Sequence, residues 1–462
     1  MSNGQTPVGG APADGTLWAR LRRRFSGEGF VSHVLTLVTG TVVGQGATVL
    51  AAPLLSRIFA PEQFAVAALF LSATNLLYAS ACGRYELALM LPKDEDKAAN
   101  VLALALALSV AATLLVTTVV LLFGRSILGF LGLPATEGWY LYLPLSVPLA
   151  AWVMLGRHWQ ARKKRFETVA RSDMCYGVAG PYAQMWAFTL FWPARGVMLI
   201  GGQLIARLFA VCVLFRTLCA DLWHHRTELS VGRMGAAARE YWRFPTCLGL
   251  SGIASFLAQE LPSFLMVAYF GKEVLGLYYL GRRVLTVPMI FLGHAVGEVF
   301  FQRIAAAQTD RPRQRRLLLS VHLYLLLIVA VPMLVIFVWG GGIFAFVFGE
   351  KWRVAGHYAS LLVPMLTAHF VVWPTRMLLM ATQRQLVALI WFVIHLGLTV
   401  GSFWLGRLAG RPEAAILYYS LSSAVMYIIY AALAAHFLGR GLVAGPAKDA
   451  DAAGPDSGEA EL

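Results

Sequence analysis

Charged side chains inside long apolar stretches are the residues of this chain whose types and spacing could carry out chemistry. The set contains five arginines and three glutamates: Arg84, Arg207, Arg282, Arg283, Arg376, Glu86, Glu260 and Glu298. A charge at the centre of a membrane-spanning helix costs about 2.5–3.5 kcal/mol on insertion scales, so it is usually paired or faces water. The excess is cationic, and guanidinium groups bind phosphate oxygens through two parallel hydrogen bonds. The set therefore favours an anionic, phosphate-bearing ligand.

Two of these arginines are adjacent. Arg282 and Arg283 lie about a third of the way into one apolar stretch, and Pro288 can bend a helix just beyond them. We expect at least one of the two to line a cavity. The alternative is a structural ion pair between one of them and Glu260 in the preceding stretch.

Three further polar residues fall in the first half of the chain. Arg207 follows Gln203 by four residues, so both share one helix face. The pair suits either a cavity contact or a hydrogen bond inside the surrounding helices. Gln45 lies in the first apolar stretch, where it serves either packing or ligand contact.

A polar and aromatic stripe occupies one later stretch. His369, Trp373 and Arg376 follow one another at spacings of four and three residues. Such a stripe could stack a sugar ring and hold a phosphate. A tryptophan and an arginine near a membrane surface are equally typical of an interfacial anchor.

Two other pairs could take part in gating or in an ion relay. Arg84 and Glu86 are two residues apart within an expected helix over 62–90, so we expect them to face different ways. They would either reach the membrane surface or close a gate at that end. His294 and Glu298 are four residues apart, which suits a proton or cation relay or ordinary hydrogen bonding between helices.

The overall composition excludes a soluble protein. Hydrophobic residues make up 58% of the chain and charged residues 13%, and the mean hydropathy is +0.65. Soluble domains carry about 25% charged residues. The net charge of +14 does not indicate nucleic-acid binding, because the basic residues lie between apolar stretches. No CxxC, HExxH or P-loop motif is present, so we expect no catalytic residue, metal site or cofactor.

The apolar stretches predict an all-α integral membrane protein with about twelve transmembrane helices, because bare backbone polar groups are not tolerated in lipid. The expected spans are 31–56, 62–90, 99–123, 139–157, 173–192, 197–218, 246–270, 274–301, 317–339, 358–380, 385–405 and 413–437. The gaps on one side contain 25 Lys and Arg residues and those on the other side contain 8. The basic side, which includes both termini, is therefore predicted to be cytoplasmic.

The two halves of the chain begin alike. In Pro53–Ala65 and in Pro262–Gly276 a proline in a helix is followed by a short turn with an acid and then by a small residue. Apart from chance similarity, this indicates two pseudo-repeated six-helix lobes around a central cavity. The expected organisation is a cytoplasmic tail 1–29, an N-lobe 30–222, an inter-lobe segment 223–245, a C-lobe 246–438 and a disordered cytoplasmic tail 439–462.

The chain resembles the Wzx-type oligosaccharide-lipid flippases, the polysaccharide biosynthesis branch of the multidrug/oligosaccharidyl-lipid/polysaccharide exporter superfamily. The segments that carry this resemblance are Pro53–Phe64, Gly83–Ala98, Gly276–Pro288, Val363 with Pro364, and Pro374. One departure is Ala65, where the family usually has glycine. The resemblance implies a V-shaped cavity between the lobes and a polyprenyl-diphosphate-linked glycan as cargo.

We therefore expect a transporter without covalent chemistry. It would flip an undecaprenyl-diphosphate-type oligosaccharide across the bacterial inner membrane by alternating access, for O-antigen, capsule or exopolysaccharide synthesis. Expected partners are this lipid-linked oligosaccharide, membrane lipids and polysaccharide polymerase machinery, but no nucleic acid. The alternatives are a drug or cation exporter of the same superfamily and an integral-membrane glycan polymerase or ligase.

Overall fold

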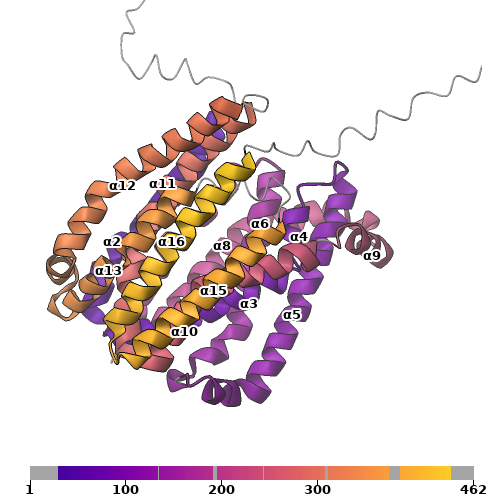
Figure 1. The fold of residues 1–462 in the computed structure, drawn as a ribbon. Coiled ribbons are helices and arrows are strands. Elements are labelled where there is room, and N and C mark those ends of the chain that lie inside the picture. Colours follow the sequence, from indigo (N-terminus) through magenta and orange to yellow (C-terminus); the bar gives the residue numbers. More distant parts are fainter. Residues whose placement is uncertain are drawn as a thin grey trace, which may run out of the picture.

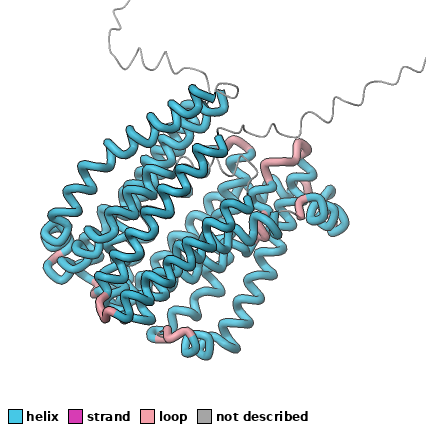
Figure 2. Tube along the Cα trace, in the orientation of Figure 1, coloured by secondary structure: helices cyan, strands magenta, loops and turns pink. Residues whose placement is uncertain are grey.

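Twelve long helices dominate the part of the chain that the structure describes. The computed structural model describes residues 30–133, 135–190, 195–242, 244–306, 311–373 and 385–438, and Figure 2 shows no strand among them. The long helices in this part of the chain are α2 (Phe30–Ile58), α3 (Pro61–Ala81), α5 (Glu95–Phe130), α6 (Leu143–Arg162), α7 (Phe166–Leu190), α8 (Gly196–His224), α10 (Gly249–Phe270), α11 (Lys272–Ala306), α12 (Arg311–Phe348), α13 (Arg353–Val372), α15 (Gln385–Leu408) and α16 (Pro412–Leu438). Short helices include α4 (Tyr85–Ala88) and α9 (Val231–Glu240).

Nine of the helices in the described part of the chain are long and apolar enough to cross a membrane. The other three long helices are α2, α7 and α11. Helices α5 and α12 have 36 and 38 residues, which is about 54 and 57 Å at 1.5 Å per residue. They extend beyond the expected spans because helical hydrogen bonding continues where the hydrophobic stretch ends. Large apolar side chains of α5 such as Leu114, Leu121 and Leu122 are exposed, as lipid-facing residues are.

The helix packing confirms the internal repeat. In one half, α2 packs on α7, α7 on α8, α6 on α8, α5 on α6 and α3 on α6. In the other half, α10 packs on α15, α15 on α16, α13 on α16, α12 on α13 and α11 on α13. The five pairs correspond one to one when the six long helices of the first half are matched in chain order with the six of the second half, so that α2 corresponds to α10 and α8 to α16. The described helices therefore form two six-helix lobes. In Figure 1, α12 of the second lobe lies on the left and α5 of the first lobe on the right.

The lobes meet chiefly where α3 packs against α10 and α11. Gly276, near the start of α11, makes the closest part of this contact possible. A Cβ atom at Gly276 would lie 1.8 Å from the carbonyl oxygen of Pro61. Only glycine fits at such a backbone approach.

The lobes also seal one end of the molecule, where α2 ends and α13 begins. Trp352 is fully buried there, and its Nε1 donates a hydrogen bond to the carbonyl oxygen of Ser56 at 2.9 Å. The hydroxyl of Ser56 donates to the carbonyl oxygen of Phe348 at 3.2 Å. The rings of Phe64 and Trp352 pack edge to face with centroids 5.1 Å apart. We call this contact the inter-lobe seal.

At the opposite end, one expected span is interrupted. The sequence predicts a continuous helix over 62–90, but α3 ends at Ala81 and the chain turns before α4. Gly83 and Arg84 have φ values of 59° and 61°, which belong to the left-handed region and break helical hydrogen bonding. The prediction of one continuous helix is therefore wrong in its last turns.

Candidate functional site

A cavity of about 350 Å³ lies between the lobes, at the middle level of the helices around it. It is lined by α2, α3, α7 and α8 from the N-lobe and by α10 and α11 from the C-lobe. Five of the twelve site residues expected from the sequence line it: Gln45, Arg207, Glu260, Arg282 and Arg283. The three long helices outside the nine apolar spans are α2, α7 and α11, and all three contribute to the cavity wall.

The adjacent arginines of α11 are both half-buried at the cavity. The Nη1 of Arg282 donates a hydrogen bond to the carbonyl oxygen of Gln259 at 3.1 Å. The Nη1 of Arg283 donates to the hydroxyl of Tyr279 at 2.9 Å, and its guanidinium carbon lies 5.7 Å from the centre of that ring. Each of these contacts uses one of the five N–H donors of a guanidinium.

Glu260 on α10 is bound by the opposite lobe rather than by an arginine. Its Oε2 accepts a hydrogen bond from the Ser72 hydroxyl at 2.7 Å, and its Oε1 accepts one from Asn75 Nδ2 at 2.9 Å. Both donors lie on α3, one turn apart. None of the ion pairs formed among the described residues includes Glu260, so the alternative of a structural pair with Arg282 or Arg283 is not seen there.

Arg207 provides the positive charge of the N-lobe wall. It is buried on α8, and its Nη1 donates a hydrogen bond to the Ser146 hydroxyl on α6. That hydroxyl lies 3.0 Å from the hydroxyl of Thr74 on α3. Gln203, one turn before Arg207, accepts a hydrogen bond from the Tyr176 hydroxyl at 2.9 Å. The shared helix face predicted for Arg207 and Gln203 therefore points to the cavity, which both side chains line.

Gln45 reaches the cavity because α2 packs tightly on α7. A Cβ atom at Gly177 would lie 1.8 Å from the carbonyl oxygen of Gly44, so the two backbones touch. Thr48, which lies on the cavity wall one turn after Gly44, donates a hydrogen bond to the carbonyl oxygen of Gly177 at 3.2 Å.

The charged side chains described at the cavity are three arginines and one glutamate. The arginines come from both lobes, and the hydrogen bonds that the carboxylate accepts come from α3. A cationic cavity at mid-height in a helical membrane protein can bind an anion that would otherwise have to shed its hydration in lipid.

The comparisons with known proteins agree on one group. A family described as polysaccharide biosynthesis protein matches residues 54–356. The chain belongs to this family. The resemblance found in the sequence is thereby confirmed. No curated protein sequence matches the chain.

Several solved structures have the same fold as this protein. The lipid II flippase MurJ, in an inward closed conformation, has a TM-score of 0.64 at 10% identity, covering 88% of each chain. A mutant of the Vibrio cholerae MATE transporter VcmN has a TM-score of 0.57 at 15% identity, covering 89% of this chain and 96% of that one. MATE in complex with MaD5 has a TM-score of 0.58 at 15% identity, covering 88% and 96%. The protein is thus a helical membrane protein, with twelve long helices among the described residues and the fold of these solved structures.

Two residues of the polar and aromatic stripe, His369 and Trp373, are not among the described residues that line the cavity. His369 stacks on Tyr427 with ring centroids 4.8 Å apart and on Trp373 at 5.2 Å. Tyr427 in turn packs on Trp391 and on the buried His395. These rings form a cluster within the C-lobe, which favours packing for His369 and Trp373.

Three predicted site residues lie wholly or partly outside the described part of the chain. Arg376 lies outside the described residues, and so do the side chains of His294 and Glu298, although the backbone of α11 continues through them. Their proposed roles stay predictions.

Arg84 and Glu86 form an ion pair, so the prediction that they face different ways is wrong. Arg84 Nη1 lies 3.6 Å from Glu86 Oε1, and Glu86 is fully buried. The left-handed turn at Arg84 brings the two side chains together. The guanidinium also covers Gly252 of α10, where a Cβ atom would lie 2.8 Å from Arg84 Nη2. The pair therefore lies at a contact between the lobes.

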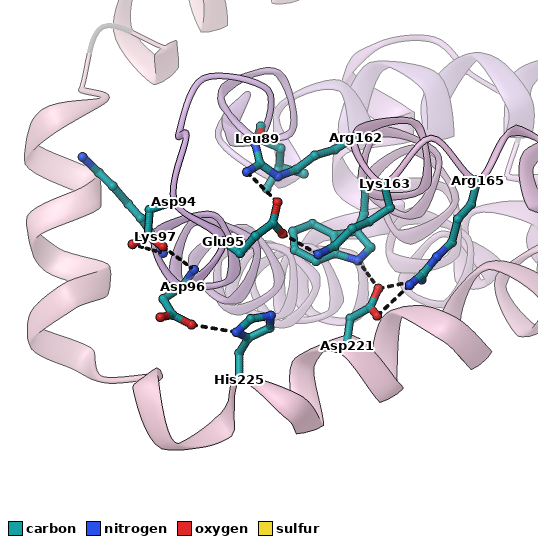
Figure 3. Close-up of polar contacts among 11 residues, drawn as sticks. Leu89, Asp94, Glu95, Asp96, Lys97, Arg162, Lys163, Arg165, Asp221 and His225 are labelled. Atoms are coloured by element: carbon teal, nitrogen blue, oxygen red, sulfur yellow. Dashed lines mark hydrogen bonds and ion pairs between the residues drawn. The ribbon is translucent and has the colours of Figure 1, made fainter. Parts of the chain in front are cut away.

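Beyond this pair, a polar network lines the basic end of the N-lobe (Figure 3). Glu95 accepts hydrogen bonds from Arg162 and Lys163, and Asp221 accepts two from Arg165 at 2.8 and 3.0 Å. Lys97 donates to Glu240 of α9 at 2.7 Å and lowers the pKa of that carboxyl. The network attaches α9, between the lobes in sequence, to the N-lobe.

Sequence reasoning missed Ser72, Asn75 and the two tyrosines of the cavity wall, Tyr176 and Tyr279. Ser72 and Asn75 are three residues apart in an otherwise apolar helix, which was a usable signal. The tyrosines carried none, because buried tyrosines are common in membrane helices.

Proposed function

We propose that this protein flips a polyprenyl-diphosphate-linked oligosaccharide from the cytoplasmic to the periplasmic leaflet of the bacterial inner membrane. The reaction is transport without covalent chemistry. The product serves surface polysaccharide synthesis, whether O-antigen, capsule or exopolysaccharide. The basic end of the molecule faces the cytoplasm in this proposal, in line with the positive-inside rule.

The observation that carries the proposal is the cationic cavity between the lobes. Arg207 on the N-lobe faces Arg282 and Arg283 on the C-lobe across one cavity of about 350 Å³. A diphosphate bound there would receive charge-assisted hydrogen bonds from both lobes. The family and the likeness to a lipid II flippase support a lipid-linked glycan as the class of cargo.

Alternating access follows from the two-lobe architecture. The inter-lobe seal around Trp352 joins the two lobes at the end opposite the basic end. The head group would enter from the cytoplasmic side while its lipid tail stays in the bilayer. Breaking the seal and closing the contact near Arg84 would then expose the cavity to the other side.

A reconstitution assay tests the proposal. Purified protein in vesicles containing a fluorescent polyprenyl-diphosphate glycan should raise the rate at which an added glycan-modifying enzyme reaches the label. Arg283→Gln should lower this rate about tenfold or more, because a charge-assisted bidentate contact is lost. Arg283 is the variant of choice because its hydrogen bond to Tyr279 stays within α11.

The controls separate loss of site from loss of fold. Arg171→Gln removes an equally charged side chain from an exposed ion pair on α7, outside the cavity lining, and should leave the rate unchanged. An unchanged rate in Arg283→Gln would contradict the site. If the native protein does not raise the rate of label exposure but exports cationic dyes, the protein is a drug exporter and not a flippase.

A further inference from the structure

The charge of the cavity is set by four side chains among those described. Arg207, Arg282 and Arg283 are positive and Glu260 is negative, which leaves a net charge of two positive. Each phosphate of a diphosphate diester carries about one negative charge at neutral pH. The described cavity therefore matches the charge of a diphosphate head group and no more.

Glu260 is built into this cavity as a separate negative charge. Ser72 and Asn75 of the opposite lobe each donate a hydrogen bond to one of its oxygens, at 2.7 and 2.9 Å. The arginines next to it donate instead to a backbone carbonyl and to two hydroxyls. Each carboxylate oxygen has about two acceptor sites, so one remains on each for a ligand hydroxyl.

The size of the cavity limits which part of the cargo can lie close to the Glu260 carboxylate. Pockets for small molecules have volumes of about 300–1,000 Å³, and this cavity, at about 350 Å³, is at the lower end. It accommodates a diphosphate with the adjoining sugar but not a whole oligosaccharide. The sugar next to the diphosphate is thus the one that meets Glu260.

We propose that Glu260 restricts the cargo to diphosphate lipids whose first sugar is uncharged. This inference rests on the proposed function and deepens it. Glu260 accepts hydrogen bonds from the hydroxyls of a neutral sugar. An acidic first sugar places a second carboxylate beside Glu260 after the arginines have been neutralised by the phosphates, and like charges in a poorly solvated site repel strongly.

The test compares two cargoes in the vesicle assay. Both are polyprenyl-diphosphate lipids, one with N-acetylglucosamine and one with glucuronic acid as the first sugar. The native protein should flip the neutral cargo about tenfold faster or more. Glu260→Gln should narrow this preference by about tenfold, chiefly by raising the rate for the acidic cargo. The glutamine oxygen can accept from Asn75 and its amide nitrogen can donate to the Ser72 hydroxyl, so the fold should be retained.

A matched control variant and a second cavity variant test whether the change in cargo preference is specific to Glu260. Glu167→Gln removes one exposed carboxylate from α7 outside the cavity and should leave the preference unchanged. Arg283→Gln lowers the cavity charge by one and should slow both diphosphate cargoes. Thermal unfolding of each purified variant in detergent shows whether it is folded.

The outcomes distinguish this inference from the proposed function. Equal rates for both cargoes, or a preference that Glu260→Gln does not change, would overturn the role of Glu260 while leaving the flippase intact. Failure of the native protein to flip either cargo would instead remove the proposed function on which the inference rests.

Discussion

At the scale of single residues, the structure shows how a buried ion pair arises from a break in a helix. Arg84 can approach Glu86 because Gly83 and Arg84 adopt left-handed backbone conformations. Glu86 is fully buried and neither of its side-chain oxygens has a hydrogen-bond partner among the described residues. The Arg84 guanidinium is therefore the main group that offsets its desolvation, and removing one partner of such a pair is costly.

A double-mutant cycle should reveal this dependence. Arg84→Ala leaves the Glu86 carboxylate buried without its cation, so the free energy of unfolding should fall by about 3–5 kcal/mol. Adding Glu86→Gln should recover part of the loss because the uncompensated charge is gone. Thermal unfolding in detergent measures the midpoint for both single variants and the double variant. Strictly additive shifts would mean that the two side chains do not interact.

At the scale of helices, packing both within and between the lobes depends on places where two backbones touch. Helix α11 approaches α3 at Gly276, and α2 approaches α7 at Gly177. Glycine is disfavoured inside helices by about 0.5–1 kcal/mol relative to alanine. At these two positions the close approach outweighs that cost.

Two glycine-to-alanine variants should therefore act in opposite directions. Gly276→Ala places a Cβ atom 1.8 Å from the Pro61 carbonyl oxygen, so α3 and α11 must separate and the unfolding midpoint should fall. Gly342→Ala, in α12, meets no atom within 4 Å and should keep or raise the midpoint. Thermal unfolding of the two purified variants and the native protein measures these midpoints. Equal midpoints would argue against a tight contact at Gly276.

At the scale of the whole molecule, the two lobes are held together at one end by the inter-lobe seal. Trp352 fills it, and its indole N–H is bound by the backbone of α2 at Ser56. Because this contact lies between the lobes, the alternating access proposed above requires it to open. The strength of this contact should therefore set the equilibrium between the conformation with the seal closed and the one with the seal open.

Weakening the seal should shift that balance. Trp352→Ala removes a fully buried ring and its hydrogen bond, so backbone amides over 55–64 and 346–356 should exchange hydrogen faster. Trp352→Phe keeps most of the ring volume and should have a smaller effect. Hydrogen exchange followed by mass spectrometry measures both, with α5 as an internal reference. Faster exchange spread evenly over both lobes would indicate unfolding rather than opening of the seal.

The sequence by itself determined that the chain crosses a membrane with about twelve helices, that its halves repeat and that its membrane-embedded charges are mostly cationic. These properties follow from hydropathy, helix length and the cost of charge in lipid, which act locally along the chain. Arg282 and Arg283 could be singled out in this way because a charge in an apolar stretch demands an explanation wherever it lies.

Only the tertiary structure decided which charges meet. Glu260 is bound by Ser72 and Asn75, nearly two hundred residues earlier, and not by the arginines nearest to it in sequence. Arg207 joins Arg282 and Arg283 at one cavity, whereas His369 turns into the C-lobe interior. Helix periodicity fixes the face on which a residue lies, but the rotation and contacts of each helix depend on packing between lobes.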